Sequence, residues 1–183
     1  VNNHSEKFQL VNINGGKMNK EKTTRVLNYL EELFPDAYCE LNHDSDFQLL
    51  VAVMLSAQTT DKKVNELTKD LFKKYPDVKT MSQASLIQLQ EDIKTIGLYR
   101  NKAKNLLAMS KMLIDKYDGK VPSVQKELES LPGVGRKTAN VVRSVAFDIP
   151  AFAVDTHVER ISKRLGFAKK DDNVLNVEKK LCR

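Results

Sequence analysis

A glycine-rich turn at positions 131–139, with the sequence LPGVGRKTA, holds the residue types best suited to chemistry. Glycine tolerates a positive φ, so Gly133 and Gly135 allow the backbone to turn until successive N–H groups at the start of the next helix point outward together. The helix dipole adds to these donors, and Val134 would insert into the core. The turn is predicted to bind a phosphate without reading a base sequence. The alternative is an ordinary helix-to-helix turn in which Gly133 is a cap and Gly135 is incidental.

Two side chains near this turn could perform nucleophilic and acid–base chemistry. Lys137 lies in the first turn of the second helix, where the dipole and burial would both favour an uncharged, nucleophilic amine. The helix from Lys137 to Phe147 rises roughly 16 Å. The following loop, 148–154, can extend up to roughly 23 Å, so the chain can return Asp155 beside Lys137. A carboxylate there could stabilise a cationic sugar and move protons. A solvated surface lysine and a plain helix cap are the alternatives.

Apolar residues recur at helical spacing along the chain, which predicts an all-α fold. Helices are predicted over about 20–34, 45–55, 60–75, 86–93, 100–117, 123–131, 136–149, 155–165 and from 173 onward. The helix that begins after Ser45 is apolar nearly all round, which indicates a central buried helix. Ser123 and Asp155 are predicted to cap the helices that follow them. No stretch shows the alternation of a half-buried strand.

Composition and charge favour a globular protein with an anionic partner. The 183 residues include 30 Lys and Arg against 24 Asp and Glu, a net charge of +6 that suits a polyanion. Hydrophobic residues make up 41% of the chain, which excludes wholesale disorder. The two cysteines, Cys39 and Cys182, can make no disulfide framework and lack the spacing of metal ligands. We therefore expect no metal site and a location in the cytoplasm.

The sequence predicts neither a membrane span nor an export signal. The longest uncharged stretch, from Phe47 to Thr60, is shorter than the roughly 20 residues that cross a bilayer. Residues 1–20 carry scattered Asn, His, Glu and Lys and lack the apolar core of a secretion signal. We interpret residues 1–17 as a flexible leader that precedes the fold. No membrane partner is expected.

Four motifs, in this order along the chain, resemble the endonuclease III family of helix-hairpin-helix DNA glycosylases. They are LSAQTTD at 55–61, IGLYRNKA at 96–103, LPGVGRKTANVV at 131–142 and VDTHV at 154–158. The resemblance covers roughly Asp46 to the last residue, with a looser match from Met18. It implies a helical barrel domain at 38–149, with the hairpin at about 123–147, and a second helical domain, incomplete here, formed by a helix at 18–37 and by 150–183.

The resemblance also implies a cofactor that this chain cannot hold alone. Family members commonly continue into a run of four cysteines that binds a [4Fe-4S] cluster. Cys182 lies too early in the sequence to match the first ligand, and Cys39 lies at the opposite end. We expect the chain to be truncated before the cluster ligands and to contain no cofactor, because four thiolates are required. The [4Fe-4S] cluster is expected only in the full-length family member.

The resemblance implies the activity of a base-excision enzyme, which removes oxidised pyrimidines from duplex DNA and cleaves the abasic sites that result. The amine of Lys137 would attack C1′ of the damaged nucleotide, displace the base and form a Schiff base, after which β-elimination cuts the strand. The carboxylate of Asp155 would stabilise the developing positive charge and shuttle protons. Damaged bases pair poorly and therefore cost less to flip out of the duplex. A monomer in the bacterial cytoplasm or nucleoid is expected.

The resemblance also assigns residues that contact DNA or support the site. Gln58 and Leu98 match the wedges that fill the gap left by the flipped base; a helix-terminal polar residue and a loop-packing leucine are their alternatives. The hairpin residues that match DNA-binding positions are Gly133, Val134, Gly135 and Arg136. Three further residues match positions near the pocket or the turn and are interpreted as supporting groups: Ser56, Thr138 and His157.

Two other functions fit parts of the sequence. A monofunctional adenine glycosylase has the same fold but no lysine at the position of Lys137. A non-catalytic helix-hairpin-helix module that holds DNA phosphates needs neither Lys137 nor Asp155. The presence of Lys137, and of His157 after Asp155, favours the glycosylase and lyase.

Overall fold

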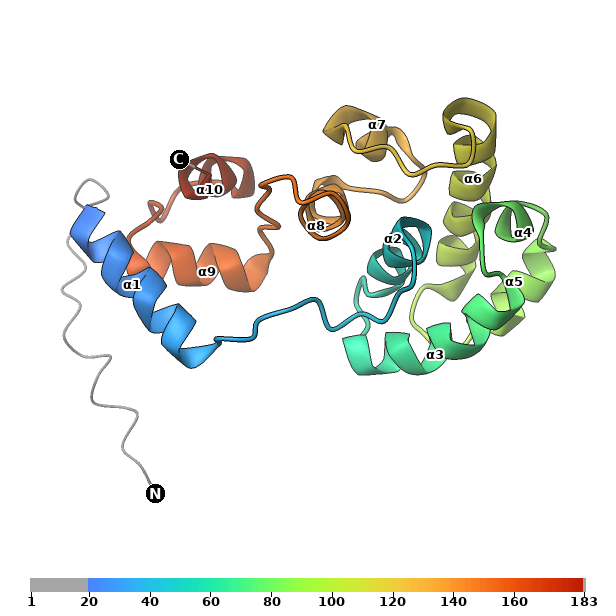
Figure 1. Cartoon of the computed structure of the whole chain (residues 1–183), viewed down its shortest axis with the longest axis horizontal. Coiled ribbons are helices and arrows are strands. Elements are labelled where there is room, and N and C mark those ends of the chain that lie inside the picture. Colours follow the sequence, from blue (N-terminus) through green and yellow to red (C-terminus); the bar gives the residue numbers. More distant parts are fainter. Residues whose placement is uncertain (1–19, 183) are drawn as a thin grey trace, which may run out of the picture. The chain divides into compact units, whose positions relative to one another are not determined.

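The computed structural model describes residues 20–182, and their regular structure is entirely helical, with no strand (Figure 1). The helices are α1 (Lys20–Leu33), α2 (Asp46–Leu55), α3 (Asp61–Lys74), α4 (Val78–Ser82), α5 (Leu86–Asp92), α6 (Tyr99–Tyr117), α7 (Gln125–Ser130), α8 (Arg136–Ala146), α9 (Thr156–Leu165) and α10 (Val174–Leu181). The predicted all-α fold is confirmed. The leader predicted for 1–17 lies outside the described residues. No helix within 20–182 is long and apolar enough to cross a membrane.

The described chain divides into two compact units. Cys39–Ala151 form one unit, which contains α2 to α8. The described residues up to Tyr38, together with those from Phe152 onward, form the other, which contains α1, α9 and α10. The hairpin, Gln58 and Leu98 therefore all belong to the Cys39–Ala151 unit.

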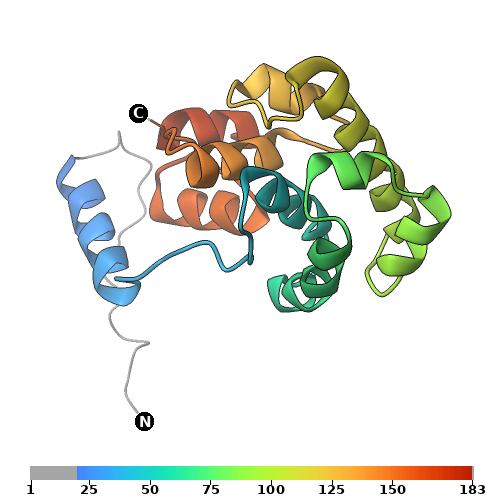
Figure 2. The same ribbon diagram turned by 45° about the vertical axis from the view of Figure 1, so that its right-hand side comes forward.

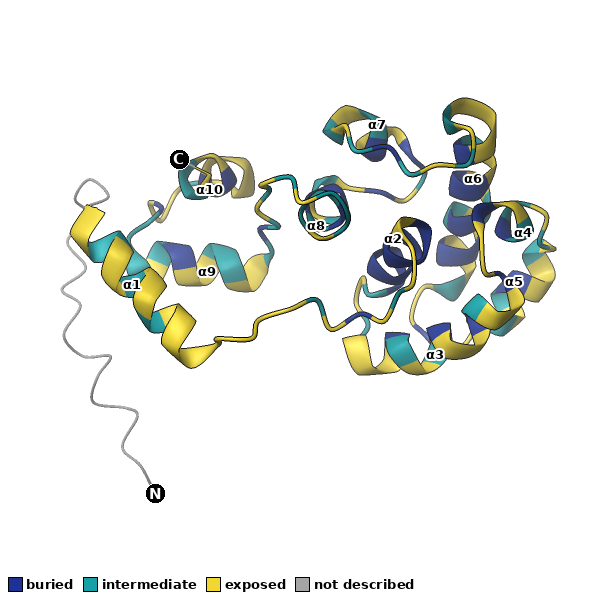
Figure 3. Ribbon diagram, in the orientation of Figure 1, coloured by how far each residue is buried: buried dark blue, intermediate teal, exposed yellow. Residues whose placement is uncertain are grey.

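The core of the Cys39–Ala151 unit is built around α2. The Ser45 hydroxyl accepts a hydrogen bond from the Gln48 backbone N–H at 3.2 Å and so caps the helix. Every residue from Phe47 to Leu55 is buried, and Figure 3 shows most of α2 in dark blue. The helix packs against α3, α6 and α8 (Figures 1 and 2). The central buried helix that the sequence predicted is confirmed, and its all-round apolar surface is the reason, because it leaves no face suited to water.

The long helix α6 joins most of the remaining elements of this unit. It buries Ala103, Leu106, Met109 and Leu113, which recur at intervals of three and four residues along one face. α4 and α5 pack against it. α4 was not predicted, because five residues are too few to show a helical period. Its start was nevertheless encoded by a reciprocal cap, in which Asp77 and Thr80 bond each other's backbone N–H.

The start of α7 differs from the prediction. Val124, not Ser123, is the N-cap residue, and it makes no side-chain cap hydrogen bond. Contacts with α8 hold this helix instead: the Gln125 amide donates to Asn140 Oδ1 at 3.3 Å and accepts from Arg143 Nη1 at 3.1 Å. Tertiary hydrogen bonds have replaced the local cap that the serine suggested.

The smaller unit has a core of its own. Val154, Ala168 and Val177 are buried together, and Val158 and Leu181 pack against them. α9 begins at an Asp155 cap, as predicted, and ends at Gly166, which has φ +76. Left-handed glycine at this point is a common helix stop. The apolar side chains Leu27, Leu30, Leu33 and Phe34, in or just after α1, are exposed.

Candidate active site

The predicted hairpin is a tight turn between α7 and α8. The Val134 backbone N–H donates to the Leu131 carbonyl at 3.0 Å, and both side chains are buried in the core. Val134 therefore anchors the turn as the sequence predicted. Intrahelical bonding in α8 begins with the Ala139 N–H, which donates to the Gly135 carbonyl at 2.9 Å. An α-helix leaves its first N–H groups without an acceptor in the helix itself, which makes this end suited to an anion.

The two glycines of the turn have different structural roles. Gly133 has φ +80, and a Cβ placed on it would lie 2.8 Å from Asn105 Cβ and 2.9 Å from Met54 Cε. Only glycine fits there without a shift of its neighbours. Gly135 is the N-cap of α8, with φ −94, and a Cβ on it would meet nothing within 4 Å. The fold thus requires Gly133 but not Gly135, whose bare backbone leaves room for a close approach from outside.

Lys137 is the second residue of α8, next to this open backbone. Its side chain is exposed, so the burial predicted from the sequence is wrong, and the helix N-terminus remains as its distinctive environment. Arg136, which precedes it, pairs with Glu129 of α7 at 3.5 Å across the turn. Thr138 is half-buried. Lys137 is therefore an exposed residue at the end of a helix that attracts phosphates.

Asp155 is fixed by its role as the cap of α9. Its Oδ1 accepts hydrogen bonds from the backbone N–H groups of His157 and Val158, both at 2.9 Å. The cap role proposed from the sequence is therefore confirmed. The His157 side chain is exposed, and its Nδ1 lies 3.2 Å from Arg160 Nη2. Asp155 belongs to the smaller unit and Lys137 to the Cys39–Ala151 unit, so their approach stays a prediction.

Gln58 and Leu98 share an uncommon backbone conformation. Their φ values are +57 and +58, in the left-handed region that residues other than glycine seldom adopt. Both side chains are exposed, and Leu98 exposes 57% of its surface. Leu98 is thus not a loop-packing leucine. Asp118 and Asp148 of the same unit share this conformation, so it does not by itself mark a functional residue.

Lys102 is a further residue of this region, and sequence reasoning missed it. Its Nζ donates to the carbonyls of Leu55 and Ala57 at 2.9 and 2.7 Å, and to the Thr59 hydroxyl at 3.1 Å. Its exposure is only 7%, and this burial lowers the pKa of its ammonium group. The signal was its place beside Ala103 on the buried face of α6. The half-buried Ser56 bonds the Val53 carbonyl at 3.0 Å and so closes the end of α2.

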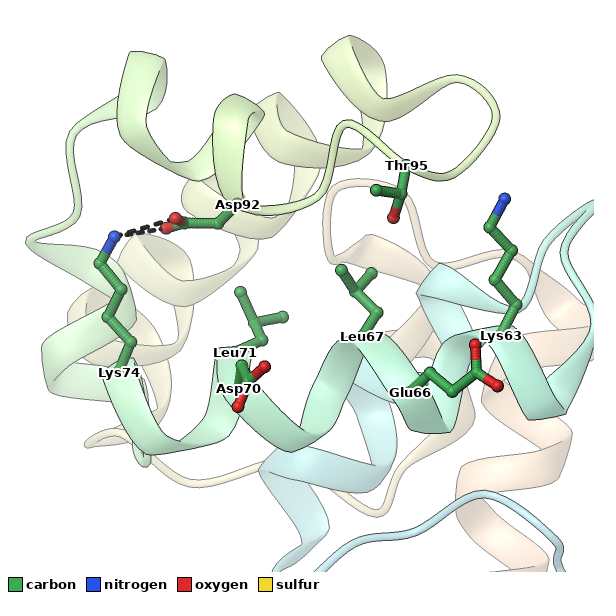
Figure 4. Close-up of a pocket in the computed structure, with 8 residues that line it drawn as sticks. All are labelled: Lys63, Glu66, Leu67, Asp70, Leu71, Lys74, Asp92 and Thr95. Atoms are coloured by element: carbon green, nitrogen blue, oxygen red, sulfur yellow. Dashed lines mark hydrogen bonds and ion pairs between the residues drawn. The ribbon is translucent and has the colours of Figure 1, made fainter.

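A surface hollow between α3 and α5 lies on another part of the same unit (Figure 4). Its floor is apolar, and charges of both signs surround it. Lys74 pairs with Asp92 at 2.7 Å, and the Tyr75 hydroxyl donates to the same carboxylate at 2.9 Å. These bonds fasten α3 to α5. We interpret the hollow as part of the scaffold, because the ion pair between Lys74 and Asp92 at its edge joins the two helices that form it.

The described residues do not fit the iron–sulfur cluster that the resemblance implied. Within 20–182, no group of three or more His, Cys, Asp or Glu side chains could hold a metal ion. Cys39 is half-buried in one unit, and Cys182 is exposed at the end of α10 in the other. A [4Fe-4S] cluster needs four ligands, which these residues do not supply.

Comparison with known proteins supports the same family. A family model described as an HhH-GPD superfamily base excision DNA repair protein matches residues 51–183. The chain is 56% identical to endonuclease III of Bacillus subtilis (strain 168), over 91% of this chain and 76% of that protein. It is 45% identical to endonuclease III of Escherichia coli (strain K12), over 91% of this chain and 78% of that protein.

Solved structures show the same likeness. A trapped endonuclease III–DNA covalent intermediate matches with a TM-score of 0.86 and 56% identity, over 90% of this chain and 78% of that one. A thermostable thymine-DNA glycosylase, at 22% identity and a TM-score of 0.77, shares the fold. The predicted glycosylase fold is confirmed, and the likenesses favour neither of the two alternative functions. The chain belongs to the HhH-GPD superfamily of base excision DNA repair proteins and, within it, to the endonuclease III family of DNA glycosylases and abasic-site lyases.

Proposed function

We propose that this enzyme removes oxidised pyrimidines from duplex DNA and that Lys137 is its nucleophile. The observation that carries the proposal is the position of Lys137, an exposed residue in the first turn of α8, directly after a hairpin whose Gly135 leaves open space. A phosphate held at this helix end would bring the neighbouring nucleotide within reach of the amine. The similar structure of a trapped covalent DNA intermediate supports a covalent route.

The proposed chemistry follows from a primary amine and a carboxylate. The Lys137 amine attacks C1′ of the damaged nucleotide, and the base leaves with the electrons of the glycosidic bond and takes up a proton. A proton then passes from Nζ to O4′, the C1′–O4′ bond breaks, and the opened sugar is joined to the lysine by a protonated Schiff base between Nζ and C1′. Loss of a proton from C2′ expels the 3′ phosphate and breaks the strand. Asp155 would stabilise the cationic sugar and carry protons during these steps.

Recognition is proposed to begin with the cost of flipping. An oxidised pyrimidine stacks and pairs poorly, so less free energy is lost when it leaves the helix. Gln58 and Leu98 would enter the space that it vacates. Their exposed side chains, held on left-handed turns of one compact unit, support this role. The hairpin would hold the backbone through N–H groups at the start of α8, without reading the sequence.

The two units are proposed to contribute different parts of the active site. We assign Cys39–Ala151 as the helical barrel domain that carries the hairpin and both wedge residues. The other unit would contribute Asp155 at the start of α9. One chain supplies the hairpin, the wedge residues, the nucleophile and the carboxylate, so we propose that the enzyme acts as a monomer. The bacterial relatives support a place in the bacterial cytoplasm or nucleoid.

The lesion specificity can be tested with a panel of duplexes. The wild-type chain is incubated with duplexes that contain thymine glycol, an abasic site, adenine opposite 8-oxoguanine, or no lesion. We expect strand cleavage of the first two only. Excision of adenine without strand cleavage would indicate the monofunctional adenine glycosylase instead. Binding of every duplex with equal affinity and no cleavage would indicate a non-catalytic module.

A further inference from the structure

One buried lysine supports the turn that carries Gln58. The Lys102 ammonium donates to the carbonyls of Leu55 and Ala57 and to the hydroxyl of Thr59, at 2.9, 2.7 and 3.1 Å. Two of these acceptors, on Ala57 and Thr59, flank Gln58 in the sequence. The acceptors lie more than forty positions before the lysine in the chain. The turn after α2 is therefore fastened on both sides of Gln58 by a side chain from α6.

The same residue is tied to the turn that carries Leu98. The Lys102 backbone N–H donates to the Leu98 carbonyl at 3.0 Å, which forms the first turn of α6. Leu98 is the N-cap of that helix and makes no side-chain cap hydrogen bond of its own. Lys102 thus bonds the Leu98 turn through its backbone and the Gln58 turn through its side chain. No element other than α6 is needed to connect them.

The environment of this lysine is specific. All three of its side-chain acceptors are uncharged oxygens, and the residue is 7% exposed. A buried cation is costly unless it is well hydrogen-bonded, so this ammonium depends on the carbonyls of the turn in place of water. Conversely, Gln58 and Leu98 both occupy the left-handed region, which persists only where the surroundings enforce it. Lys102 contacts both turns, through its side chain at the Gln58 turn and through its backbone N–H at Leu98.

We propose that Lys102 is a positioning residue that fixes the two DNA-inserting turns in one arrangement before DNA binds. The inference rests on the proposed role of Gln58 and Leu98 as wedges. A preformed arrangement means that little ordering free energy is lost when the two side chains enter the duplex. Removal of the ammonium should therefore impair extrusion of the base and leave the chemistry at Lys137 unchanged.

The test separates flipping from chemistry. Lys102→Met keeps the apolar stem and removes the ammonium, and Lys104→Met, an exposed lysine of the same helix, is the matched control. Two single-turnover rates are measured: excision of thymine glycol from a duplex, and cleavage of an abasic site in a single strand, where no base has to be extruded. We expect Lys102→Met to slow duplex excision by roughly 10- to 100-fold and to change single-strand cleavage by less than about twofold. Lys104→Met should change neither rate beyond about twofold.

A direct probe of extrusion accompanies the rates. 2-Aminopurine placed beside the lesion gains fluorescence when its neighbour leaves the stack, and this gain should be lost in Lys102→Met. The double variant Lys102→Met with Gln58→Ala should lose less than the product of the two single effects, because both changes act on one turn. Equal loss of both rates, or unchanged fluorescence and excision in Lys102→Met, would overturn the inference.

Two further variants keep the result interpretable. Gln58→Ala and Leu98→Ala test the wedge roles themselves. If they reduce duplex excision and Lys102→Met does not, the positioning role of Lys102 is wrong, whereas the wedge role of Gln58 and Leu98 is supported. If neither affects duplex excision, the wedge proposal fails, and the inference falls with it. If circular dichroism shows that Lys102→Met does not fold, Thr59→Val is used instead, because it removes the hydroxyl acceptor of the lysine. A selective loss of duplex excision then supports the role, and no loss overturns it.

Discussion

Gly133 lies so close to Asn105 that a Cβ on the glycine would stand 2.8 Å from the Cβ of the asparagine. The same atom on Gly135, two residues later, would meet no neighbour within 4 Å. The hairpin therefore contains one glycine that the packing of the turn requires and one that it does not. This contrast separates the stability of the turn from its proposed contact with DNA.

Substitution of the first glycine should destabilise the enzyme. Gly133→Ala forces a side chain into a left-handed position and against α6, which should lower the free energy of unfolding by about 2–4 kcal/mol. Urea unfolding followed by circular dichroism measures the change. An unfolding free energy equal to that of the wild type would show that the turn can rearrange around the added atom.

Substitution of the second glycine should affect DNA and leave the fold unchanged. Serine is a good N-cap residue, so Gly135→Ser should keep the unfolding free energy within about 0.5 kcal/mol. Its side chain would occupy the space that we assign to a phosphate oxygen. The affinity for duplex DNA, measured by fluorescence anisotropy, should fall by about tenfold. An unchanged affinity would mean that the sugar-phosphate backbone of DNA does not approach Gly135.

The cap and the chemistry of Asp155 can be separated in the same way. Asparagine caps helices as well as aspartate does, so Asp155→Asn should leave the melting temperature nearly unchanged. The loss of the negative charge should slow excision by about 100-fold or more. Single-turnover excision of thymine glycol provides the rate. Full activity in this variant would assign Asp155 a capping role alone.

The ion pair between α3 and α5 predicts a pH-dependent contribution to stability. Partial burial alone would raise the pKa of Asp92, but hydrogen bonds from Lys74, Gln88 and Tyr75 outweigh burial and lower the pKa. Such a carboxyl contributes stability above its unfolded pKa of about 3.9, and the contribution is lost as the pH falls through the lower folded value. Asp92→Asn should therefore be less stable than the wild type at about pH 7, and the difference should shrink toward about pH 3.

Urea unfolding across this pH range measures the effect. Asp115→Asn, at an exposed aspartate of α6, is the matched control for the loss of a carboxylate. A stability difference for Asp92→Asn that stays constant between the two pH values would contradict the linkage.

The sequence predicted most helices because their apolar spacing is regular. α2 was identified as central since it has no polar face, and Asp155 was identified as a cap from its place before α9. α4 escaped because it is shorter than two helical turns. The start of α7 was misplaced because Gln125 bonds α8, and such a contact leaves no periodic trace in the sequence.

The site was less predictable than the fold. Spacing and family resemblance selected Lys137, Gln58 and Leu98, but neither indicates exposure or backbone conformation. Lys137 was expected to be buried and is exposed. The contacts of Lys102 join residues that are more than forty positions apart, so only the folded chain reveals them. Sequence patterns report which face of a helix is apolar, whereas these relationships depend on how separate helices meet.

Trapping with borohydride tests most directly whether Lys137 is the nucleophile. Borohydride reduces a Schiff base to a stable amine, so incubation with duplex DNA that contains an abasic site should attach the strand to the protein. We predict a covalent adduct for the wild type and for Lys126→Gln, an exposed lysine of α7, and none for Lys137→Gln. Peptide mass spectrometry should place the adduct on Lys137. An adduct that persists in Lys137→Gln, or that maps to another residue, would contradict the account.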